Sequence, residues 1–120
     1  MEALVVDDDQ AVRAFLCRLL GREGWSAQAC QTVDEALAAA KSGTFRLAFV
    51  DVHVGSGDGI ELAKSLRSMQ PKLSVILMSG SSTHEERARR VGMEPILLKP
   101  VSVETVCALL GACDGDGERP

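Results

Sequence analysis

Short apolar runs alternate with helix-like patterns along this chain, and the alternation limits its fold more than any other feature. The apolar runs lie at residues 3–6, 25–30, 47–50, 73–78 and 96–98. Patterns with helical periodicity follow them at residues 10–20, 33–42, 62–69, 83–91 and 103–110. Strands that are apolar on both sides suit a parallel sheet covered by helices on both faces. The sequence therefore predicts a single α/β domain with an open, doubly wound parallel sheet.

Capping residues mark where several of these helices begin. Asp9 precedes the first helical pattern, and Ser102 precedes the last. Thr32 and Glu35 have the spacing of a capping box ahead of the alanine-rich second pattern. These positions predict side chains that accept hydrogen bonds from the first free backbone N–H groups of each helix.

The region 83–91 is the weakest of the predicted helices. It offers only Ala88 and Val91 as apolar anchors. Its charged run from His84 to Arg90 is typical of a solvated helix face, and a partner surface is the alternative interpretation.

Composition and charge exclude several classes of function. The chain has 120 residues and a net charge of −4, which argues against direct binding to nucleic acid. No apolar run approaches the ~20 residues that span a bilayer, so no membrane association is expected. The N-terminus lacks the features of a signal peptide, which predicts a cytoplasmic protein.

The cysteines do not form a recognisable metal or redox motif. They are scattered singly along the chain at Cys17, Cys30, Cys107 and Cys113. We expect reduced thiols that are mostly buried.

Polar side chains follow four of the predicted strands at the point where each strand ends. Three aspartates follow the first run, and Asp51 follows the third. Ser79 follows the fourth run and Lys99 the fifth. The carboxyl ends of parallel strands meet at one edge, where ligands of such sheets bind. Clustered carboxylates favour a divalent cation such as Mg²⁺, and an aspartate there could accept a phosphoryl group.

The ordered set of motifs VVDDD, FVDV with GSGDG behind it, LMSG and LLKP resembles the receiver domain of two-component response regulators. The resemblance covers residues 3–110, and the combination is far more specific than any single motif. It implies the flavodoxin-like (βα)5 fold with strand order 2-1-3-4-5 and helices on both faces of the sheet.

The resemblance implies a phosphoacceptor and its metal ligands. Asp51 matches the phosphoacceptor, which with Asp7 and Asp8 would bind Mg²⁺, one of that acidic pair through water. The backbone carbonyl of His53 matches the remaining protein ligand. The His53 side chain is interpreted as an exposed loop group that at most influences water access to the phosphate.

The resemblance also implies a switch. Ser79 matches the hydroxyl that moves toward the phosphoryl group, and Lys99 matches the lysine that pairs with it. A cis Lys99-Pro100 bond would direct that lysine into the site. Asp9 is interpreted as a helix cap only, and Asp58 as part of a turn.

Three departures from the family pattern bear on the output. Gly55 stands where proline is usual, which predicts a looser loop after the phosphoacceptor. The stretch 79–99 is shorter than usual, so a full-length, stable helix there is in doubt. Ile96 occupies the place of the usual aromatic switch residue, so we expect the aromatic step of the family's output mechanism to be absent or replaced.

Together these expectations describe a receiver domain at 1–112, with 113–120 as a disordered tail or the start of a linker. Its partners would be a histidine kinase or histidine phosphotransfer protein, and an output domain or protein. The surface formed by 83–91, 96–98 and 103–110 is where the family would contact an output or form a homodimer. The protein would promote its own phosphorylation and slow dephosphorylation without turning over a separate substrate.

Two alternatives from other classes stay open. A Mg²⁺-dependent phosphatase of the haloacid-dehalogenase kind also uses an aspartyl phosphate, but it needs a second aspartate where this chain has His53. A receiver-like interaction module would work without phosphorylation, but such modules usually lose an acid or the lysine.

Overall fold

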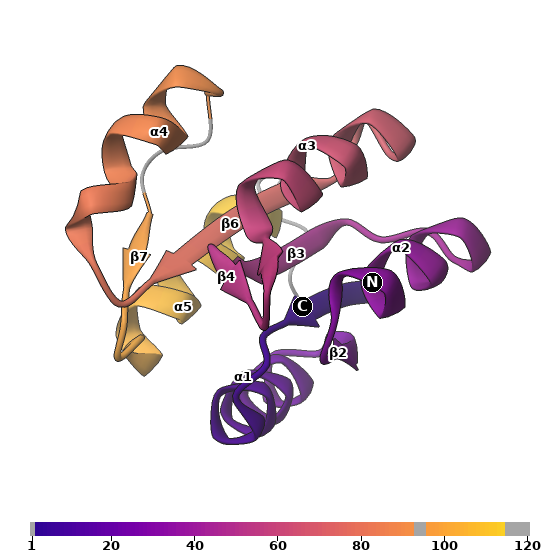
Figure 1. Ribbon diagram of the computed structural model, residues 1–120. Helices are drawn as coiled ribbons and strands as arrows, with labels where there is room; N and C mark the ends of the chain where they lie inside the picture. Colours follow the sequence, from indigo (N-terminus) through magenta and orange to yellow (C-terminus); the bar gives the residue numbers. More distant parts are fainter. Residues whose placement is uncertain (1, 93–95, 115–120) are drawn as a thin grey trace.

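The main sheet is parallel and has the predicted strand order. The computed structural model describes residues 2–92 and 96–114. Neighbouring strands in space follow the order β2-β1-β3-β6-β7, in which β6 and β7 are the fourth and fifth strands of this sheet. The strands are β1 (Glu2–Val6), β2 (Ser26–Cys30), β3 (Leu47–Asp51), β6 (Ser74–Ser79) and β7 (Leu97–Leu98). The flavodoxin-like topology expected from the sequence is therefore confirmed (Figure 1).

Helices cover both faces of this sheet (Figure 1). They are α1 (Gln10–Arg22), α2 (Val33–Ser42), α3 (Gly59–Met69), α4 (Glu85–Arg90) and α5 (Val103–Asp114), with a 3₁₀ turn η1 (Ser82–His84) before α4. Buried residues of α1 and α5 belong to one apolar cluster, whereas those of α2, α3 and α4 belong to the other. The sheet separates the two clusters, as a doubly wound fold requires.

The first strand shows why the apolar runs have no polar alternation. Leu4 and Val6 pack in the cluster with α2 and α3, whereas Ala3 and Val5 pack in the cluster with α1 and α5. Successive side chains of a strand point to opposite faces, so a strand covered on both sides must be apolar at every position.

The predicted caps are present. Asp9 accepts a hydrogen bond from the Ala11 N–H, and Thr32 accepts one from the Glu35 N–H. Ser102 accepts one from the Thr105 N–H at the start of α5. These bonds satisfy N–H groups that have no partner inside the helix.

The segment after β3 forms a hairpin in place of the looser loop that the sequence predicted. Strands β4 (His53–Val54) and β5 (Gly57–Asp58) pair in antiparallel fashion. Gly55 adopts a positive φ of 62°, a conformation that proline cannot take. Glycine at this position therefore permits a tight turn.

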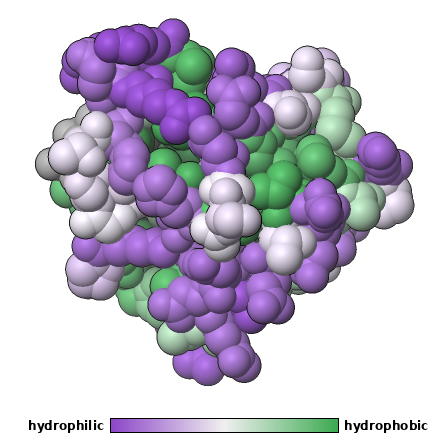
Figure 2. Space-filling model, viewed as in Figure 1, coloured by the Kyte–Doolittle hydropathy of each residue, from purple (hydrophilic) through white to green (hydrophobic). Residues whose placement is uncertain are grey.

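Helix α4 is short, as its sparse apolar anchors predicted. Its six residues include Ala88, which is fully buried, while Arg89 and Arg90 are exposed. Figure 2 shows hydrophilic side chains gathered over this helix at the upper left of the view. Little buried apolar surface therefore anchors α4 to the rest of the domain.

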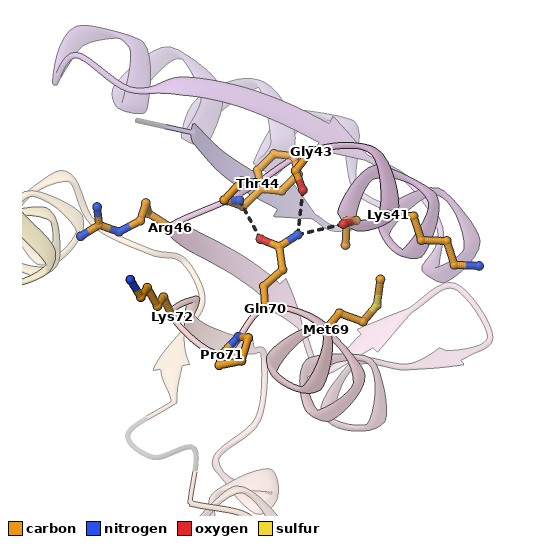
Figure 3. A pocket seen from close by; sticks show the side chains of 10 residues that line it. Lys41, Gly43, Thr44, Arg46, Met69, Gln70, Pro71 and Lys72 are labelled. Atoms are coloured by element: carbon orange, nitrogen blue, oxygen red, sulfur yellow. Dashed lines mark hydrogen bonds between the residues drawn. The ribbon is translucent and has the colours of Figure 1, made fainter.

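A glutamine joins two loops at the opposite end of the sheet from the strand-end carboxylates. The side chain of Gln70 donates hydrogen bonds to the carbonyls of Ala40 and Gly43, and it accepts one from the Phe45 N–H. These bonds cross a pocket of about 540 Å³ between the α2–β3 and α3–β6 connections (Figure 3). The clamp satisfies backbone groups that neither helix nor strand pairs.

The thiols and the end of the chain complete the fold. Cys17, Cys30 and Cys107 are free, and burial raises the pKa of Cys30 to about 11.

Helix α5 continues to Asp114, and the rest of the predicted tail lies outside the described residues. Among the described residues, no helix combines the length and apolar character needed to cross a bilayer.

Candidate functional site

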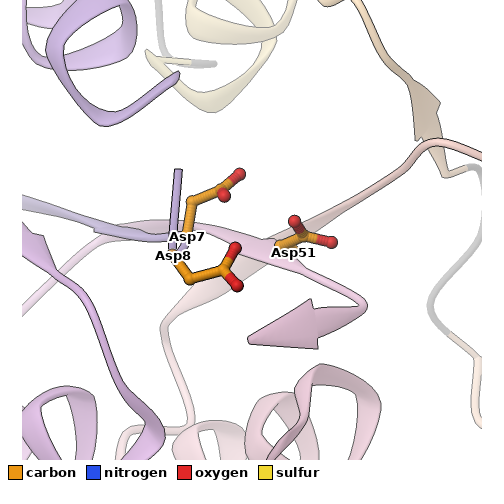
Figure 4. A group of neighbouring side chains, drawn as sticks. All are labelled: Asp7, Asp8 and Asp51. Carbon is orange, nitrogen blue, oxygen red and sulfur yellow. The ribbon is translucent and has the colours of Figure 1, made fainter. Parts of the chain in front are cut away.

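Three carboxylates lie together at the carboxyl ends of the two central strands. Asp7 and Asp8 follow β1, and Asp51 is the last residue of β3. Because β1 and β3 pair with Val6 opposite Val50, the residues that follow are neighbours. One oxygen from each carboxylate lies within 4.8 Å of the others, and the three side chains face a common space (Figure 4).

The ammonium group of Lys99 joins two of these carboxylates. Its Nζ lies 2.6 Å from Oδ2 of Asp51 and 2.7 Å from Oδ2 of Asp7. Burial alone would lower the pKa of Lys99, but its hydrogen bond to Asp51, its close contact with Asp7 and the negative charges of both acids outweigh burial and raise the pKa. The Lys99-Pro100 bond is cis, as predicted. The lysine therefore stays charged between two acids.

Asp7 is the most constrained member of the group. It is fully buried, and its Oδ2 contacts Lys99 without the geometry of a hydrogen bond. Burial raises the pKa of Asp7, and the charge of Asp51 adds to this effect, although Lys99 and the Asp9 N–H oppose it. A divalent cation would reduce the repulsion between the three carboxylates, and it would give Oδ2 of Asp7 a further partner. These residues therefore fit a metal such as Mg²⁺.

The hairpin after β3 fixes two of the carboxylates. The His53 N–H donates to Oδ1 of Asp51 at 3.0 Å, and the Gly55 N–H donates to Oδ2 of Asp8 at 3.1 Å. Proline at position 55 has no N–H and could not make the second bond. The glycine that departs from the family pattern thus helps to orient Asp8.

A close backbone contact brings the start of α3 against the end of β3. A Cβ atom at Gly59 would lie 1.8 Å from the carbonyl oxygen of Asp51. Only glycine permits this approach. The interpretation of Asp58 as part of a turn gave no indication of this packing requirement at the next residue.

Ser79 lies at the same edge of the sheet, but its hydroxyl bonds elsewhere. The residue is 1% exposed. Its Oγ lies 2.8 Å from the carbonyl oxygen of Ser81, 3.0 Å from the Ser81 N–H nitrogen and 2.7 Å from Nδ1 of His84. The structure therefore brings Asp7, Asp8, Asp51 and Lys99 into direct contact or close approach, with Ser79 held by its own loop.

Two side chains of residues 84–90, which were interpreted as a solvated face, make contacts with other parts of the chain. His84 bonds Ser79 through Nδ1, and its Nε2 lies 3.1 Å from Nε2 of His53. Arg87 pairs with Asp58 and lies 3.7 Å from Glu61. Residue composition alone carries no signal for these contacts, because they depend on how η1 folds back over the hairpin.

Asp58 has a larger role than the turn predicted for it. Its Oδ1 accepts hydrogen bonds from the Ile60 and Glu61 N–H groups and caps α3. Burial alone would raise the pKa of Asp58, but the bonds from Arg87 and from these N–H groups outweigh it and lower the pKa. Asp58 therefore connects α3 to α4.

The structure combines a doubly wound α/β fold with a lysine between two acidic side chains, at the edge of the sheet where ligands of such folds bind. Comparison with known families identifies the class of protein. The response regulator receiver domain model matches residues 3–110, and the chain belongs to this family. The resemblance that the motifs carried is thereby confirmed.

Individual relatives agree with this assignment. The chain is 33% identical to the response regulator MprA of Mycolicibacterium vanbaalenii over 96% of its own length and 54% of the relative's. It is 26% identical to the acid tolerance regulatory protein ActR of Sinorhizobium medicae, over 98% of its own length and 61% of that relative's. The chain thus spans little more than half the length of these curated relatives.

Solved structures agree as well. A response regulator from Burkholderia pseudomallei with a phosphorylated aspartic acid, calcium ion and citrate matches with a TM-score of 0.81 and 28% identity, over 99% of this chain and 75% of that one. A two-component response regulator from Clostridium difficile matches with a TM-score of 0.88 and 22% identity, over 98% of both chains. The second likeness supports the fold alone.

Proposed function

We propose that this receiver domain is a switch that accepts a phosphoryl group on Asp51. The observation that carries the proposal is the contact of the Asp51 carboxylate with Lys99, beside Asp7 and Asp8. Asp51 is the acid of this group that touches the lysine through a hydrogen bond and keeps some exposure, at 8%. A nucleophile needs both access and a nearby cation for the charge that develops.

The reaction would transfer a phosphoryl group from a histidine nitrogen of a donor to an oxygen of Asp51. The P–N bond breaks as the P–O bond forms, and the product is an acyl phosphate. Asp7, Asp8, Asp51 and the carbonyl of His53 would hold Mg²⁺, which supplies positive charge to the transferring group. Lys99 would pair its ammonium with the new phosphoryl oxygens, because the Asp51 carboxylate loses its negative charge when it forms the acyl phosphate.

The donor would be a histidine kinase or a histidine phosphotransfer protein. A groove of about 500 Å³ beside Lys99 supports this, since α1 supplies its apolar wall with Ala11, Val12 and Phe15. Such a wall offers a helical donor an apolar contact next to Asp51. The relative with a phosphorylated aspartic acid adds support from similarity.

The protein would act as a phosphoacceptor that loses the group slowly by hydrolysis, with no separate substrate. A cytoplasmic location stays a prediction from the sequence. The output would be an attached domain or a partner protein, reached through the surface of α4, β7 and α5, which could also form a homodimer.

The readout of phosphorylation would depend on the region from Ser79 to α4. Ile96 is 6% exposed and packs in the apolar cluster with no ring to reorient. We expect Mg²⁺ with beryllofluoride, a phosphoryl mimic, to alter hydrogen exchange across residues 79–91 and to leave β7 nearly unchanged. A main change at Ile96 and α5 would contradict this readout.

Intact mass after incubation with acetyl phosphate and Mg²⁺ tests the acceptor. Wild type should gain one phosphoryl group that hydroxylamine removes, and Asp51→Asn should gain none. Asp34→Asn is a matched control, because Asp34 is an exposed acid in the first turn of α2. Labelling of Asp51→Asn at the wild-type level would overturn the assignment.

A further inference from the structure

His84 occupies a place that the chemistry described above does not require. It is half-buried at the end of η1, where one ring nitrogen contacts the hydroxyl of Ser79 and the other contacts His53. The two imidazole rings meet edge to face, with centroids 4.7 Å apart and an angle of 76°. His84 therefore links the loop after β6 to the hairpin after Asp51.

Counting protons assigns the direction of each bond around Ser79. A serine hydroxyl has one proton to donate, and it can accept from two groups. If Oγ donates to the Ser81 carbonyl, it accepts from the Ser81 N–H and from Nδ1–H of His84. This arrangement is the one that satisfies all three contacts.

For neutral rings, the same assignment also gives the direction of the bond between the two histidines. With its proton on Nδ1, neutral His84 has a lone pair on Nε2, and Nε2–H of His53 donates to it across 3.1 Å. Nε2 of His53 is then the donor and Nε2 of His84 the acceptor. The hydroxyl of Ser79 is thereby held in a bonded chain that runs to the molecular surface at His53.

Among the described contacts of Asp51, the donors are Lys99 and the His53 N–H, and Ser79 is not one of them. To donate to a phosphoryl group on Asp51, the hydroxyl must release the Ser81 carbonyl. When its oxygen also moves toward that group, as the proposed switch requires, the His84 Nδ1–H loses its acceptor. An unsatisfied, half-buried donor is unfavourable. The contact with His84 thus favours the unphosphorylated arrangement.

We propose that His84 is a positioning residue that restrains the Ser79 hydroxyl and so opposes the phosphorylated state. The inference rests on the proposed function, since it takes Asp51 as the acceptor. When Ser79 moves, His84 loses its bond at the junction between η1 and α4. Phosphorylation would therefore break the bond between His84 and Ser79 and free the start of α4 to move. This route does not need the aromatic residue that Ile96 replaces.

Substitutions at position 84 separate the two contacts of the ring. The amide of His84→Asn reaches the place of Nδ1 and can still donate to Ser79, but it has no atom at the place of Nε2. The amide of His84→Gln reaches toward His53 and has no donor at the place of Nδ1. His84→Ala removes both contacts.

The affinity for beryllofluoride in saturating Mg²⁺ measures the restraint. Removing one hydrogen bond of ordinary strength should tighten beryllofluoride binding about two- to tenfold in His84→Ala and His84→Gln. His84→Asn should bind like wild type, which would show rescue by the Nδ1 donor. Equal affinities in wild type and all three variants would overturn the proposal, as would equal tightening in all three.

Nitrogen-15 NMR of the imidazole groups, without Mg²⁺ or beryllofluoride, tests the restraint independently of phosphorylation. His84 should be the Nδ1–H tautomer, and Ser79→Ala should shift its Nδ1 resonance. An Nε2–H tautomer, or no response to Ser79→Ala, would overturn the inference. Thermal unfolding of each variant would show whether the folded state is retained.

The two sets of measurements distinguish failure of the inference from failure of the proposed function. If wild type and Asp51→Asn both fail to bind beryllofluoride, the proposed function fails and the role in opposing phosphorylation fails with it. If wild type binds and Asp51→Asn does not, the acceptor is supported. The comparison of Ala, Gln and Asn at position 84 then decides the role of His84 alone.

Discussion

The two halves of the site are built differently. The carboxylate half consists of Asp7, Asp8, Asp51 and Lys99, and the first three stand at the ends of central strands that are buried on both faces. The hydroxyl half consists of Ser79, His84 and α4, and beyond the end of β6 it rests on a 3₁₀ turn and a six-residue helix. The same edge of the sheet thus carries a fixed part and a weakly anchored part.

This difference suggests that the carboxylate half carries out the chemistry and the hydroxyl half transmits its result. Chemistry at a carboxylate requires charges that do not reorganise, which the sheet and Lys99 provide. Reading the state of that carboxylate requires an element whose rearrangement has a low free-energy cost, and such elements have few buried contacts. The predictions below compare the two halves, from the largest expected effect on stability to the smallest.

Gly59→Ala should have the largest effect on stability, because it disturbs the backbone packing beside Asp51 in the carboxylate half. The added Cβ would lie 1.8 Å from the Asp51 carbonyl oxygen, so α3 must move away from the end of β3. We expect a loss of about 3 kcal/mol in the free energy of unfolding, measured with urea. Gly111→Ala is the control, because nothing lies within 4 Å of its Cβ position. Similar stabilities for the two variants would refute this packing argument.

Lys99→Met should destabilise the protein less, by about 2 kcal/mol without metal, because Asp7 and Asp51 lose their shared cation. Mg²⁺ should recover more stability in this variant than in wild type, since the ion supplies the missing charge. Urea unfolding in EDTA and in Mg²⁺ measures both effects. Lys64→Met, which removes an exposed lysine paired with Glu61, should change little in either condition. If Mg²⁺ stabilises Lys99→Met no more than wild type, the three carboxylates do not form the metal site.

Asp7→Asn should stabilise the protein at pH 7 without metal, by about 1 kcal/mol. The raised pKa of Asp7 means that the folded state disfavours its charge, and this cost is fully present above that pKa. As the pH falls toward the ordinary value of 3.8, Asp7 becomes protonated and the advantage of the variant should disappear. Urea unfolding at pH 7 and pH 4 checks the sign. A variant less stable than wild type at pH 7 would show that Asp7 is stabilising as a charged group.

The carboxylate half was the more predictable from the sequence, for a physical reason. Asp7, Asp51 and Lys99 follow apolar runs, and parallel strands bring their ends together whatever the details of the loops. The helix caps likewise follow from local patterns, whereas the strand order was implied by the resemblance to the receiver family. The close approach at Gly59 was not foreseen, because a sequence pattern does not indicate how closely the backbones of β3 and α3 approach each other.

The hydroxyl half was less predictable because two of its polar contacts reach distant parts of the chain. His84 and Arg87 read as ordinary surface residues, and their partners His53 and Asp58 lie about 30 positions earlier in the chain. No periodicity encodes such pairs. The proline-to-glycine departure was read as a looser loop, whereas the N–H that glycine retains makes a bond to Asp8.

Arg87→Ala should have the smallest effect and the opposite pH dependence to Asp7→Asn. The pair of Arg87 with Asp58 joins side chains that are 43% and 39% exposed, so we expect a loss of about 0.5 kcal/mol at pH 7. Arg90→Ala, which removes an exposed charge from the same helix, is the control.

The sign follows from the lowered pKa of Asp58. A carboxylate with a lowered pKa contributes stability above its ordinary value of 3.8, and that contribution is lost as the pH falls through the folded-state pKa. The difference between wild type and Arg87→Ala should therefore be full at pH 7, shrink at acidic pH, and fall with added salt because the pair is exposed. In hydrogen exchange, the loss should appear in α4 more than in β1 or β3, because the pair anchors a helix that opens locally. A loss of protection spread evenly over the sheet would mean that α4 unfolds only with the whole domain, and the contrast between the two halves would not hold.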